Sequence, residues 1–414
     1  LQSNKLLASD GAASDEFGCS VAISGDTAIV GVYRDDDSGR YSGSAYIYHR
    51  QTDGSWLETK LLASDGDEYD HFGRSVAISG DTAIVGAESK ENNGSSSGSA
   101  YIYHRQADGS WLETKLLASD GATGDQFGSS VAISGDTAIV GASWDDDNGS
   151  YSGSAYIYHR QTDGSWLETK LLASDGAASD SFGSSVAISG DTAIVGASGD
   201  DDNGSSSGSA YIYSHQTDGS WLETKLLASD GAANDIFGYS VATSGDWAIV
   251  GAKWDDDNGS DSGSAYIYHH QADGSWLEAK LLASDGGTND IFGASIAISG
   301  VTAIVGASLD VNNDYSSGSS YMFTIQQELS TNENSTLVKT LNISDPEVDT
   351  LTYSLDGEDA ALFTIDTNAQ ISFNAPDYGV PSDAGTDNLY KVKVIATDSY
   401  GAENSIYLWV SVID

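Results

Sequence analysis

Cysteine is almost absent from this sequence of 414 residues, which contains only Cys19. One cysteine cannot form an intrachain disulfide, so a role outside the cell would need another source of rigidity. Basic residues are also scarce, because 17 Lys and Arg stand against 62 Asp and Glu, a formal net charge of −45. This balance argues against a nucleic-acid groove or an anionic-membrane patch, since both need local positive charge.

Long hydrophobic runs are missing as well. No run approaches the roughly 18 apolar residues of a membrane span, and no charged-then-apolar signal segment opens the chain. We therefore expect no membrane insertion, and we expect a mature or excised piece because residues 1–5 already belong to a repeating pattern. Hydrophobic residues still make up 39% and aromatic residues 10% of the chain, too much for a disordered acidic tail.

A repeat of 55 residues organises most of the chain. The lysine of the KLLASDG segment keeps the register of a recurring Phe-Gly dipeptide, and no insertion breaks it. Six repeats therefore fill about residues 1–325. The phenylalanines of the dipeptide are Phe17, Phe72, Phe127, Phe182, Phe237 and Phe292.

Each repeat contains four short apolar or β-branched runs, of the types SVAIS, TAIVGA, SAYIY and WLETKLLA. Gly-Asp and Asp-Gly-Ser separate the first two and the last two runs, and both are tight-turn signals. The pattern predicts an all-β fold, a six-bladed β-propeller of four-stranded blades over residues 1–326, with seven blades left open. Leu1 aligns with Trp56, so we expect the N-terminal strand to complete the sixth blade and close the ring.

The segment FG…SVAISGDTAIVGA…GSAYIY resembles the FG-GAP repeat of integrin α-subunit propellers and bacterial surface proteins, and the resemblance covers all six repeats. It implies an extracellular or cell-surface location, in a bacterium. The calcium loop of the integrin repeats lies between the first and second strands, where this chain has only the short Ser24–Thr27 turn.

The two longer connections of each repeat are polar and acidic, and a meander places both on one face of the propeller. The residues that differ most between repeats also fall there, as in binding surfaces built on a constant scaffold. Exposed aromatic side chains on this face are candidates for holding a glycan or a protein: Tyr41, Trp144, Tyr151 and Trp254. Drift at exposed positions is the alternative reading.

Acidic triplets occupy one of these loops in four repeats. Calcium prefers six to eight oxygen ligands, which clustered carboxylates and an asparagine can supply, so we expect Ca²⁺ as a bound ion. A solvated acidic rim is the alternative. The candidate ligands are Asp35, Asp37, Asp145, Asp147, Asn148, Asp200, Asp202, Asp255 and Asp257.

Catalysis is not expected from this architecture. An active site needs a unique constellation of differently tuned groups, and six near-identical repeats offer almost none. We therefore predict that the chain is not an enzyme.

Composition changes after about residue 326, because all three prolines lie beyond it. Short alternating strands over 327–414 predict a β-sandwich. The stretches ENSTLVKTLNISDPEVDTLTYSL and DNLYKVKVIATDSYG resemble cadherin-like domains of bacterial surface proteins. That resemblance implies calcium ligands at Glu333, Asp345, Glu347 and Asp398, and a sandwich without metal is the alternative.

These features together predict a non-catalytic extracellular adhesion or recognition module, stabilised by calcium, whose partner is a glycan or a surface protein. One alternative is a self-assembling subunit of an extracellular filament or sheath. Another is an accessory part of a secreted enzyme that cleaves polysaccharides or phosphodiesters.

Overall fold

The computed structural model describes residues 5–271, 274–310, 317–325, 329–341, 351–357, 359–382, 389–397 and 403–413. Its secondary structure is almost entirely β, as predicted, and the one helical segment described is the short 3-10 turn η1 (Ala360–Leu362). Within these residues, no helix has the length and apolar character that a bilayer crossing requires.

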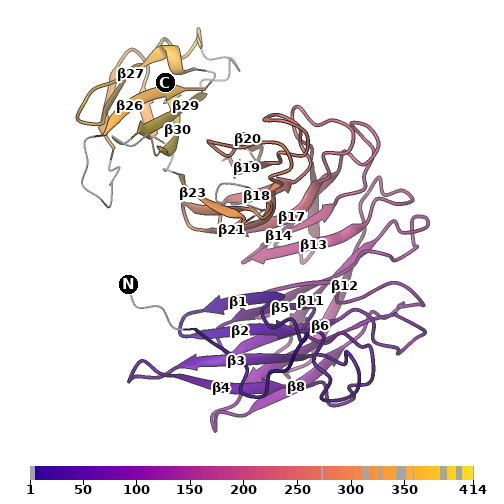
Figure 1. Cartoon of the computed structure of the whole chain (residues 1–414). Helices are drawn as coiled ribbons and strands as arrows, with labels where there is room; N and C mark the ends of the chain where they lie inside the picture. The colour runs from indigo at the N-terminus through magenta and orange to yellow at the C-terminus, as the bar shows by residue number, and fades with distance from the viewer. Residues whose placement is uncertain are drawn as a thin grey trace. The chain divides into compact units, whose positions relative to one another are not determined.

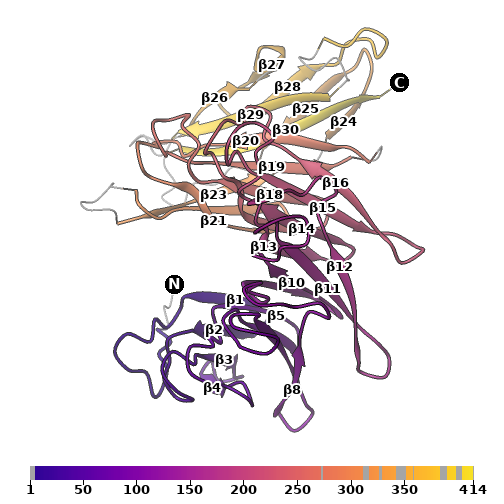
Figure 2. The same ribbon diagram turned by 90° about the vertical axis from the view of Figure 1, so that its right-hand side faces the viewer.

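Each of the first five sheets is an antiparallel meander of four strands, and their inner strands contact one another in turn (Figures 1 and 2). The four strands per repeat were predicted. The sheets are β1 (Ser20–Ser24), β2 (Thr27–Val32), β3 (Ser44–Arg50) and β4 (Trp56–Leu61); β5 (Ser75–Ser79), β6 (Thr82–Ala87), β7 (Ser99–Arg105) and β8 (Trp111–Leu116); β9 (Ser130–Ser134), β10 (Thr137–Ala142), β11 (Ser154–Arg160) and β12 (Trp166–Leu171); β13 (Phe182–Ser189), β14 (Thr192–Ala197), β15 (Ser209–His215) and β16 (Trp221–Leu226); β17 (Phe237–Ser244), β18 (Trp247–Ala252), β19 (Ser264–His270) and β20 (Trp276–Leu281).

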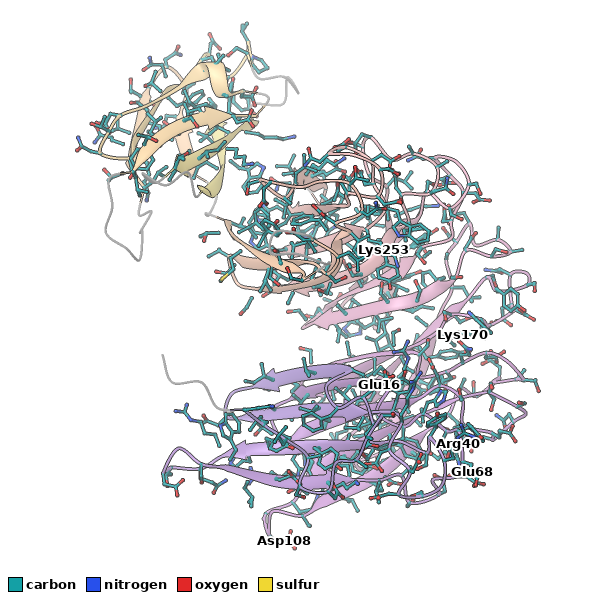
Figure 3. All side chains as sticks on the ribbon, viewed as in Figure 1. Glu16, Arg40, Glu68, Asp108, Lys170 and Lys253 are labelled. Carbon is teal, nitrogen blue, oxygen red and sulfur yellow. The ribbon has the colours of Figure 1, made fainter. Side chains whose placement is uncertain are left out.

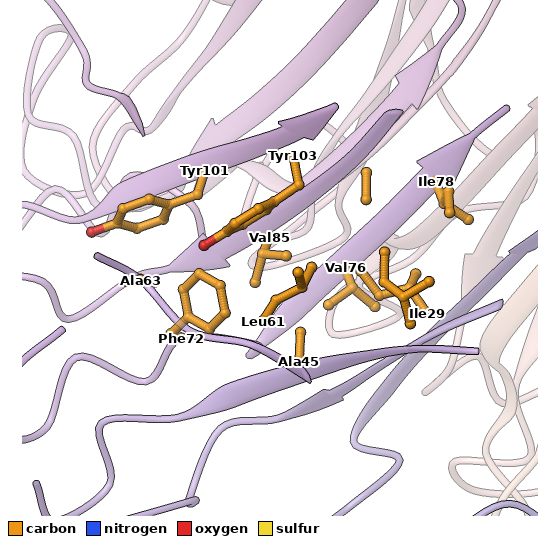
Figure 4. Close-up of a cluster of buried hydrophobic side chains, with 13 residues drawn as sticks. Ile29, Ala45, Leu61, Ala63, Phe72, Val76, Ile78, Val85, Tyr101 and Tyr103 are labelled. Carbon is orange, nitrogen blue, oxygen red and sulfur yellow. The ribbon is translucent and has the colours of Figure 1, made fainter. Parts of the chain in front are cut away.

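Neighbouring sheets pack face to face through apolar side chains. In the cluster between the first two sheets, Ile29 and Leu61 of the first meet Val76, Val85 and other side chains of the second (Figure 4). Burying an aliphatic side chain of this kind contributes about 1.5–3 kcal/mol, so the interface is the main source of cohesion between repeats.

A central strand supplies both of its faces to such clusters. On β6, Val85 packs toward the first sheet while the adjacent Ile84 packs toward the third. Successive side chains of a strand point to opposite faces, so a strand buried on both sides must be apolar at every position. This is why the TAIVGA run has no polar alternation.

The sixth repeat forms three strands, β21 (Phe292–Ser299), β22 (Thr302–Ala307) and β23 (Ser319–Ile325). Beyond β23 the sheet continues with strands of the C-terminal segment, which pair in the order β30, β29, β26, and β24 also pairs with β30. Their bounds are β24 (Leu329–Asn332), β26 (Thr352–Asp356), β29 (Leu389–Thr397) and β30 (Glu403–Ile413).

The chain divides into two compact units, residues 1–297 with 306–319 and residues 298–305 with 320–414. The predicted boundary at residue 326 stays a prediction, since the second unit takes in part of the sixth repeat. That unit has a further sheet of β25 (Thr336–Thr340), β27 (Phe363–Ile365) and β28 (Gln370–Asn374), and Phe373 of this sheet shares one buried cluster with Val392 and Leu408. A cadherin-like sandwich likewise stays a prediction.

The sheets are not closed into the expected ring. In the sixth repeat, β23 pairs in parallel with β30 at Thr324 and Ile325, and residues 1–4, which were to supply the closing strand, lie outside the described residues. The end face on β1 is accordingly uncovered: Val21 is 67% exposed, whereas its equivalent Val76 is 6% exposed. Closure by the N-terminal strand stays a prediction.

Candidate functional site

Both long connections of each repeat lie at the same end of the strands, and we call this end the loop face. In the first repeat the N–H of Tyr69, in the β4–β5 connection, donates to the carbonyl of Arg40, in the β2–β3 loop (2.7 Å). Figure 3 shows Arg40 and Glu68 near each other on this face, and Asp108, in the tight β7–β8 turn, away from them. The separation of long loops from tight turns follows from the meander.

A lysine surrounded by carboxylates lies beneath the loop face in the third repeat. The Nζ atom of Lys170 donates to Asp120 (2.7 Å), Asp145 (3.2 Å) and Asp147 (2.5 Å). The Tyr156 hydroxyl donates to the carboxylates of Asp120 (2.9 Å) and Asp145 (3.0 Å). Charge-assisted hydrogen bonds of this kind are stronger than neutral ones, so we treat the five side chains as a unit and call it a lysine cluster.

Strand register explains how the cluster forms. On β12, Lys170 is the cross-strand partner of Tyr156 on β11, so the ammonium lies 5.1 Å from the centre of the tyrosine ring. Asp145 lies in the loop after β10, where its N–H donates to the carbonyl of Ala142 (3.2 Å). Asp120 reaches the same lysine from the connection that leads out of the preceding sheet.

The same cluster recurs in three other repeats with the same sequence separations of 25 and 50 residues between the lysine and two of its carboxylates. Each lysine therefore offsets part of the negative charge of its acidic triplet. The members are Lys60 with Asp10, Asp35 and Asp37; Lys225 with Asp175, Asp200 and Asp202; and Lys280 with Asp230, Asp255 and Asp257.

The second repeat carries a variant in which a lysine replaces the first carboxylate of the triplet. Lys90 is buried and donates to Asp70 (2.9 Å). The strand lysine of this repeat, Lys115, keeps its contact with Asp65 (2.5 Å) and takes the amide oxygen of Asn92 (2.6 Å) as a second acceptor. In the second repeat, a different set of residues therefore pairs opposite charges beneath the loop.

The carboxylates and the ammonium stabilise each other's charged forms. Burial lowers the pKa of Lys170, but hydrogen bonds to Asp120 and Asp147 outweigh this effect and leave the pKa raised. Burial raises the pKa of Asp120, and the bonds from Lys170 and Tyr156 outweigh it, so this pKa is lowered. The stability from the lowered carboxyl pKa is present above its unfolded value and is lost as the pH falls through the folded value.

A second class of buried carboxylate lies just before the Phe-Gly dipeptides. Asp235 accepts a hydrogen bond from the N–H of Ala232 (2.7 Å), but burial raises its pKa to about 6. Asp125 and Asp180 occupy the same place, and burial raises their pKa values too. These carboxylates stabilise the backbone turn through this hydrogen bond, although burial disfavours their charged form.

The four residues predicted to hold a ligand all lie on the loop face, but they do not form a single group. Trp144 and Tyr151 meet edge to face at 5.4 Å and are 46% and 50% exposed. Trp254 is 43% exposed on the fifth repeat. Tyr41, on the first repeat, packs edge to face against Tyr69 at 5.8 Å.

A family model described as the FG-GAP repeat matches the chain in six segments, which cover more than half of its length: residues 1–48, 56–103, 111–158, 166–213, 221–268 and 276–323. The chain belongs to the FG-GAP repeat family. FG-GAP repeats are found in extracellular adhesion and recognition modules. No curated protein matches the sequence.

The Phe-Gly dipeptide of the FG-GAP repeat joins adjacent sheets. Phe182 is fully buried and packs edge to face on Tyr211 at 5.3 Å, while Gly183 follows it with φ of +88°. A Cβ atom on Gly183 would lie 2.3 Å from the carbonyl oxygen of Ser154. Only glycine permits both this φ and this close approach of the β11 backbone.

The donor set of the FG-GAP loops does not fit calcium. Asp35, Asp145, Asp200 and Asp255 are buried and already bonded to a lysine ammonium. The amide nitrogen of Asn148 faces the carbonyl of Ala173 (3.5 Å). In the described part of the chain, no group of three His, Cys, Asp or Glu side chains is arranged to hold a metal. Calcium at these loops stays a prediction, and the contacts favour lysine as their cation.

The calcium ligands expected in the C-terminal segment are described only at Glu333, whose Oε2 accepts a hydrogen bond from the N–H of Tyr378 (2.9 Å). Asp345, Glu347 and Asp398 lie outside the described residues. Calcium binding there stays a prediction.

Melting curves in EDTA and in millimolar Ca²⁺ are expected to coincide for the repeat unit, because a lysine ammonium already bonds the carboxylates of four of the loops. A ligand that binds only the folded state must raise Tm with its concentration, so calorimetry of the full chain checks this directly. If Ca²⁺ raised Tm and the rise persisted in the Asp345→Asn, Asp398→Asn double variant, the assignment of lysine as the loop cation would be wrong.

Several exposed or partly exposed residues of the loop face were not among the predicted ligand-binding residues. Tyr33, Arg34 and Arg40 belong to the first repeat, whereas Tyr69 and Arg74 belong to the connection into the second. In the fifth repeat, Lys253 lies over the rings of Tyr239 and Trp254. Aligning the six repeats position by position shows that at least two of the positions equivalent to 33, 34 and 41 carry aromatic or basic residues in the first, third and fifth repeats.

Proposed function

We propose that the chain is a non-catalytic recognition module of an extracellular protein, and that it holds a glycan or a protein on the loop face. The observation that carries this proposal is a contrast within the repeats. The sheets, the lysine clusters and the Phe-Gly joints are repeated nearly unchanged, while exposed side chains on one face differ from repeat to repeat.

Large aromatic side chains support the proposal because they are placed where the fold does not need them. Trp144 of the third repeat is 46% exposed, and the equivalent position of the fourth repeat is Gly199. Tyr151 has φ of +58°, and the same left-handed position in the fourth repeat holds Ser206 with φ of +50°. Exposed aromatic groups on a rigid scaffold provide contact area with little loss of side-chain entropy.

A binding screen with the full chain tests the proposal. The chain is expected to bind a member of a panel of glycans or surface proteins, and the Trp144→Ala, Trp254→Ala double variant is expected to bind at least about tenfold more weakly, the loss typical of an interface aromatic. Leu167→Ala serves as the matched control, since Leu167 is 61% exposed on β12, away from the loops.

Two outcomes would contradict the proposal: no binding to any panel member, or binding that the double variant retains in full. Light scattering of the same preparation at several concentrations addresses the alternative of a self-assembling subunit. Growth of the particles with concentration would favour assembly through uncovered end faces such as that of Val21 and Ile23.

A further inference from the structure

A cluster of arginine and tyrosine side chains lies on the loop face between the first and second repeats. It contains three of the chain's six arginines, although the chain as a whole carries a net charge of −45. We call it the Arg–Tyr patch, and its members are Tyr33, Arg34, Arg40, Tyr41, Tyr69 and Arg74.

Rings and guanidinium groups alternate through the patch. Arg40 lies 4.9 Å from the ring centre of Tyr41 and 5.9 Å from that of Tyr69. Arg34 also contacts Tyr41, at 5.7 Å from its ring centre. Arg74 lies 5.3 Å from the ring centre of Tyr33. Cation–π contacts of this kind hold flexible arginines in place at a surface.

Arg40 is the one arginine of the patch whose charge remains available. Arg34 pairs with Glu16 (2.5 Å) and Arg74 with Glu88 (3.5 Å). Across the described residues, no carboxylate lies within ion-pair distance of Arg40, which is exposed. The guanidinium of Arg40 can therefore bind an anionic group from outside the chain, preferably a planar carboxylate or a sulfate.

The fold does not require this patch. Tyr41 has φ of +54°, and the equivalent residues Ser96 and Ser206 adopt +52° and +50°. The equivalents of Tyr33 and Arg34 in the fourth repeat are Ser198 and Gly199, and that repeat keeps its lysine cluster and its strands. The patch can change without a change in the scaffold, as expected for a binding surface.

Similar groups recur on alternate repeats. Positions 33, 34 and 41 correspond to Ser143, Trp144 and Tyr151 in the third repeat and to Lys253, Trp254 and Asp261 in the fifth, while the second and fourth repeats have only small or acidic residues there. Sites repeated at this interval favour a ligand that is itself repetitive, because several weak contacts then act together.

We propose that the Arg–Tyr patch binds an acidic polysaccharide, with Arg40 contacting a carboxylate or sulfate group and Tyr41 and Tyr69 packing against the sugar ring. This inference rests on the proposed function and names its ligand class. A nucleic acid fits less well, because tracking its phosphates takes a groove lined with many basic residues, and here two of three arginines are already paired.

The test uses the full chain against polygalacturonate, dextran sulfate, neutral dextran and single-stranded DNA, with affinity measured at about 0.05 M and about 0.5 M NaCl, a range over which surface charges become strongly screened. Binding to one or both acidic polysaccharides is expected, and it should weaken with salt. Arg40→Gln should reduce the affinity at least about tenfold.

Three further variants sharpen the test. Tyr41→Ser with Tyr69→Gly introduces the residues that other repeats already tolerate, and it should weaken binding without unfolding the chain. Glu68→Gln, which removes a bordering exposed carboxylate, should strengthen binding. Arg160→Gln removes a charge at the tight-turn end, where Arg160 lies 3.9 Å from Asp136, and should have no effect.

The outcomes separate the two proposals. Binding to neutral dextran that Arg40→Gln leaves unchanged would overturn the acidic ligand and keep a glycan-binding face. Binding to DNA alone would overturn the ligand class. Failure to bind any of these polymers would overturn this inference, and only failure across the wider panel of glycans and proteins would overturn the recognition function.

Discussion

Replacing Lys170 with methionine is expected to destabilise the repeat unit by about 3 kcal/mol, the lower end of the cost of removing one partner from a buried ion pair. Methionine keeps an unbranched apolar side chain that reaches as far as Cε and lacks the ammonium. Asp145 is then left buried, with the Tyr156 hydroxyl and the Asp147 N–H as its donors. Denaturant unfolding of the variant and the wild type at neutral pH measures the difference.

The pH dependence of this loss distinguishes electrostatics from packing. The pKa of Asp120 is lowered in the folded chain, so its stabilising contribution exists above the unfolded pKa and disappears as the pH falls through the folded value. The gap between Lys170→Met and the wild type should therefore narrow below about pH 4. A gap that stays constant with pH would contradict the role given to the charges.

Lys339→Met is the control for the loss of a lysine as such. Lys339 is exposed on β25, and no ion pair to it is found in the described part of the chain. Exposed substitutions of this kind usually change stability by less than about 0.5 kcal/mol. A similar loss in both variants would mean that the clusters contribute no more than an ordinary surface charge.

The repeating sheets could be predicted from the sequence because every element that defines them is local. A period of 55 residues, tight turns at Gly25 and its equivalents, and runs such as that around Ile84 are all readable within one repeat. Packing between sheets uses the same residues again and again, so one interface implies the others. The strands were predicted on this basis.

The lysine clusters could not be predicted in the same way, although every member was visible. Lys170 was read only as a mark of the repeat register, and Asp145 as a calcium ligand, because the 25 residues between them hide their contact. The second repeat carries the one sequence signal that indicates contact between these positions. There, Lys90 and Asn92 replace two aspartates, and they contact Asp70 and Lys115 respectively.

The Arg–Tyr patch could not be predicted from the sequence either, for a different reason. Arg40 and Tyr69 come from different repeats and from unlike positions, so no alignment of repeats places them together. Their contact depends on the backbone bond between the two long connections. Ring closure is not decided by the internal repeats, because it depends on the first and last repeats, whose neighbours differ from those of every internal repeat.

Replacing Gly153 with alanine is expected to cost more than about 4 kcal/mol, a loss reserved for severe local conflicts. Gly153 has φ of +80°, and a Cβ atom there would lie 2.0 Å from the carbonyl oxygen of Phe182 and 2.5 Å from its nitrogen. The two residues form a parallel bridge that joins the third repeat to the fourth. Backbone cannot yield as a flexible side chain can, so the joint between sheets must open.

Gly164→Ala separates the contact from the backbone conformation. Gly164 has φ of +88° in the tight β11–β12 turn, and a Cβ atom there meets nothing within 4 Å. This variant should therefore be destabilised only by the strain of an alanine in the left-handed region, about 1–2 kcal/mol. Denaturant unfolding of both variants, followed by aromatic circular dichroism, measures the difference, and equal losses would contradict the argument from close approach. The expected larger loss at Gly153 would apply to the other joints as well, since the same bridge joins Gly43 to Phe72 and Gly98 to Phe127.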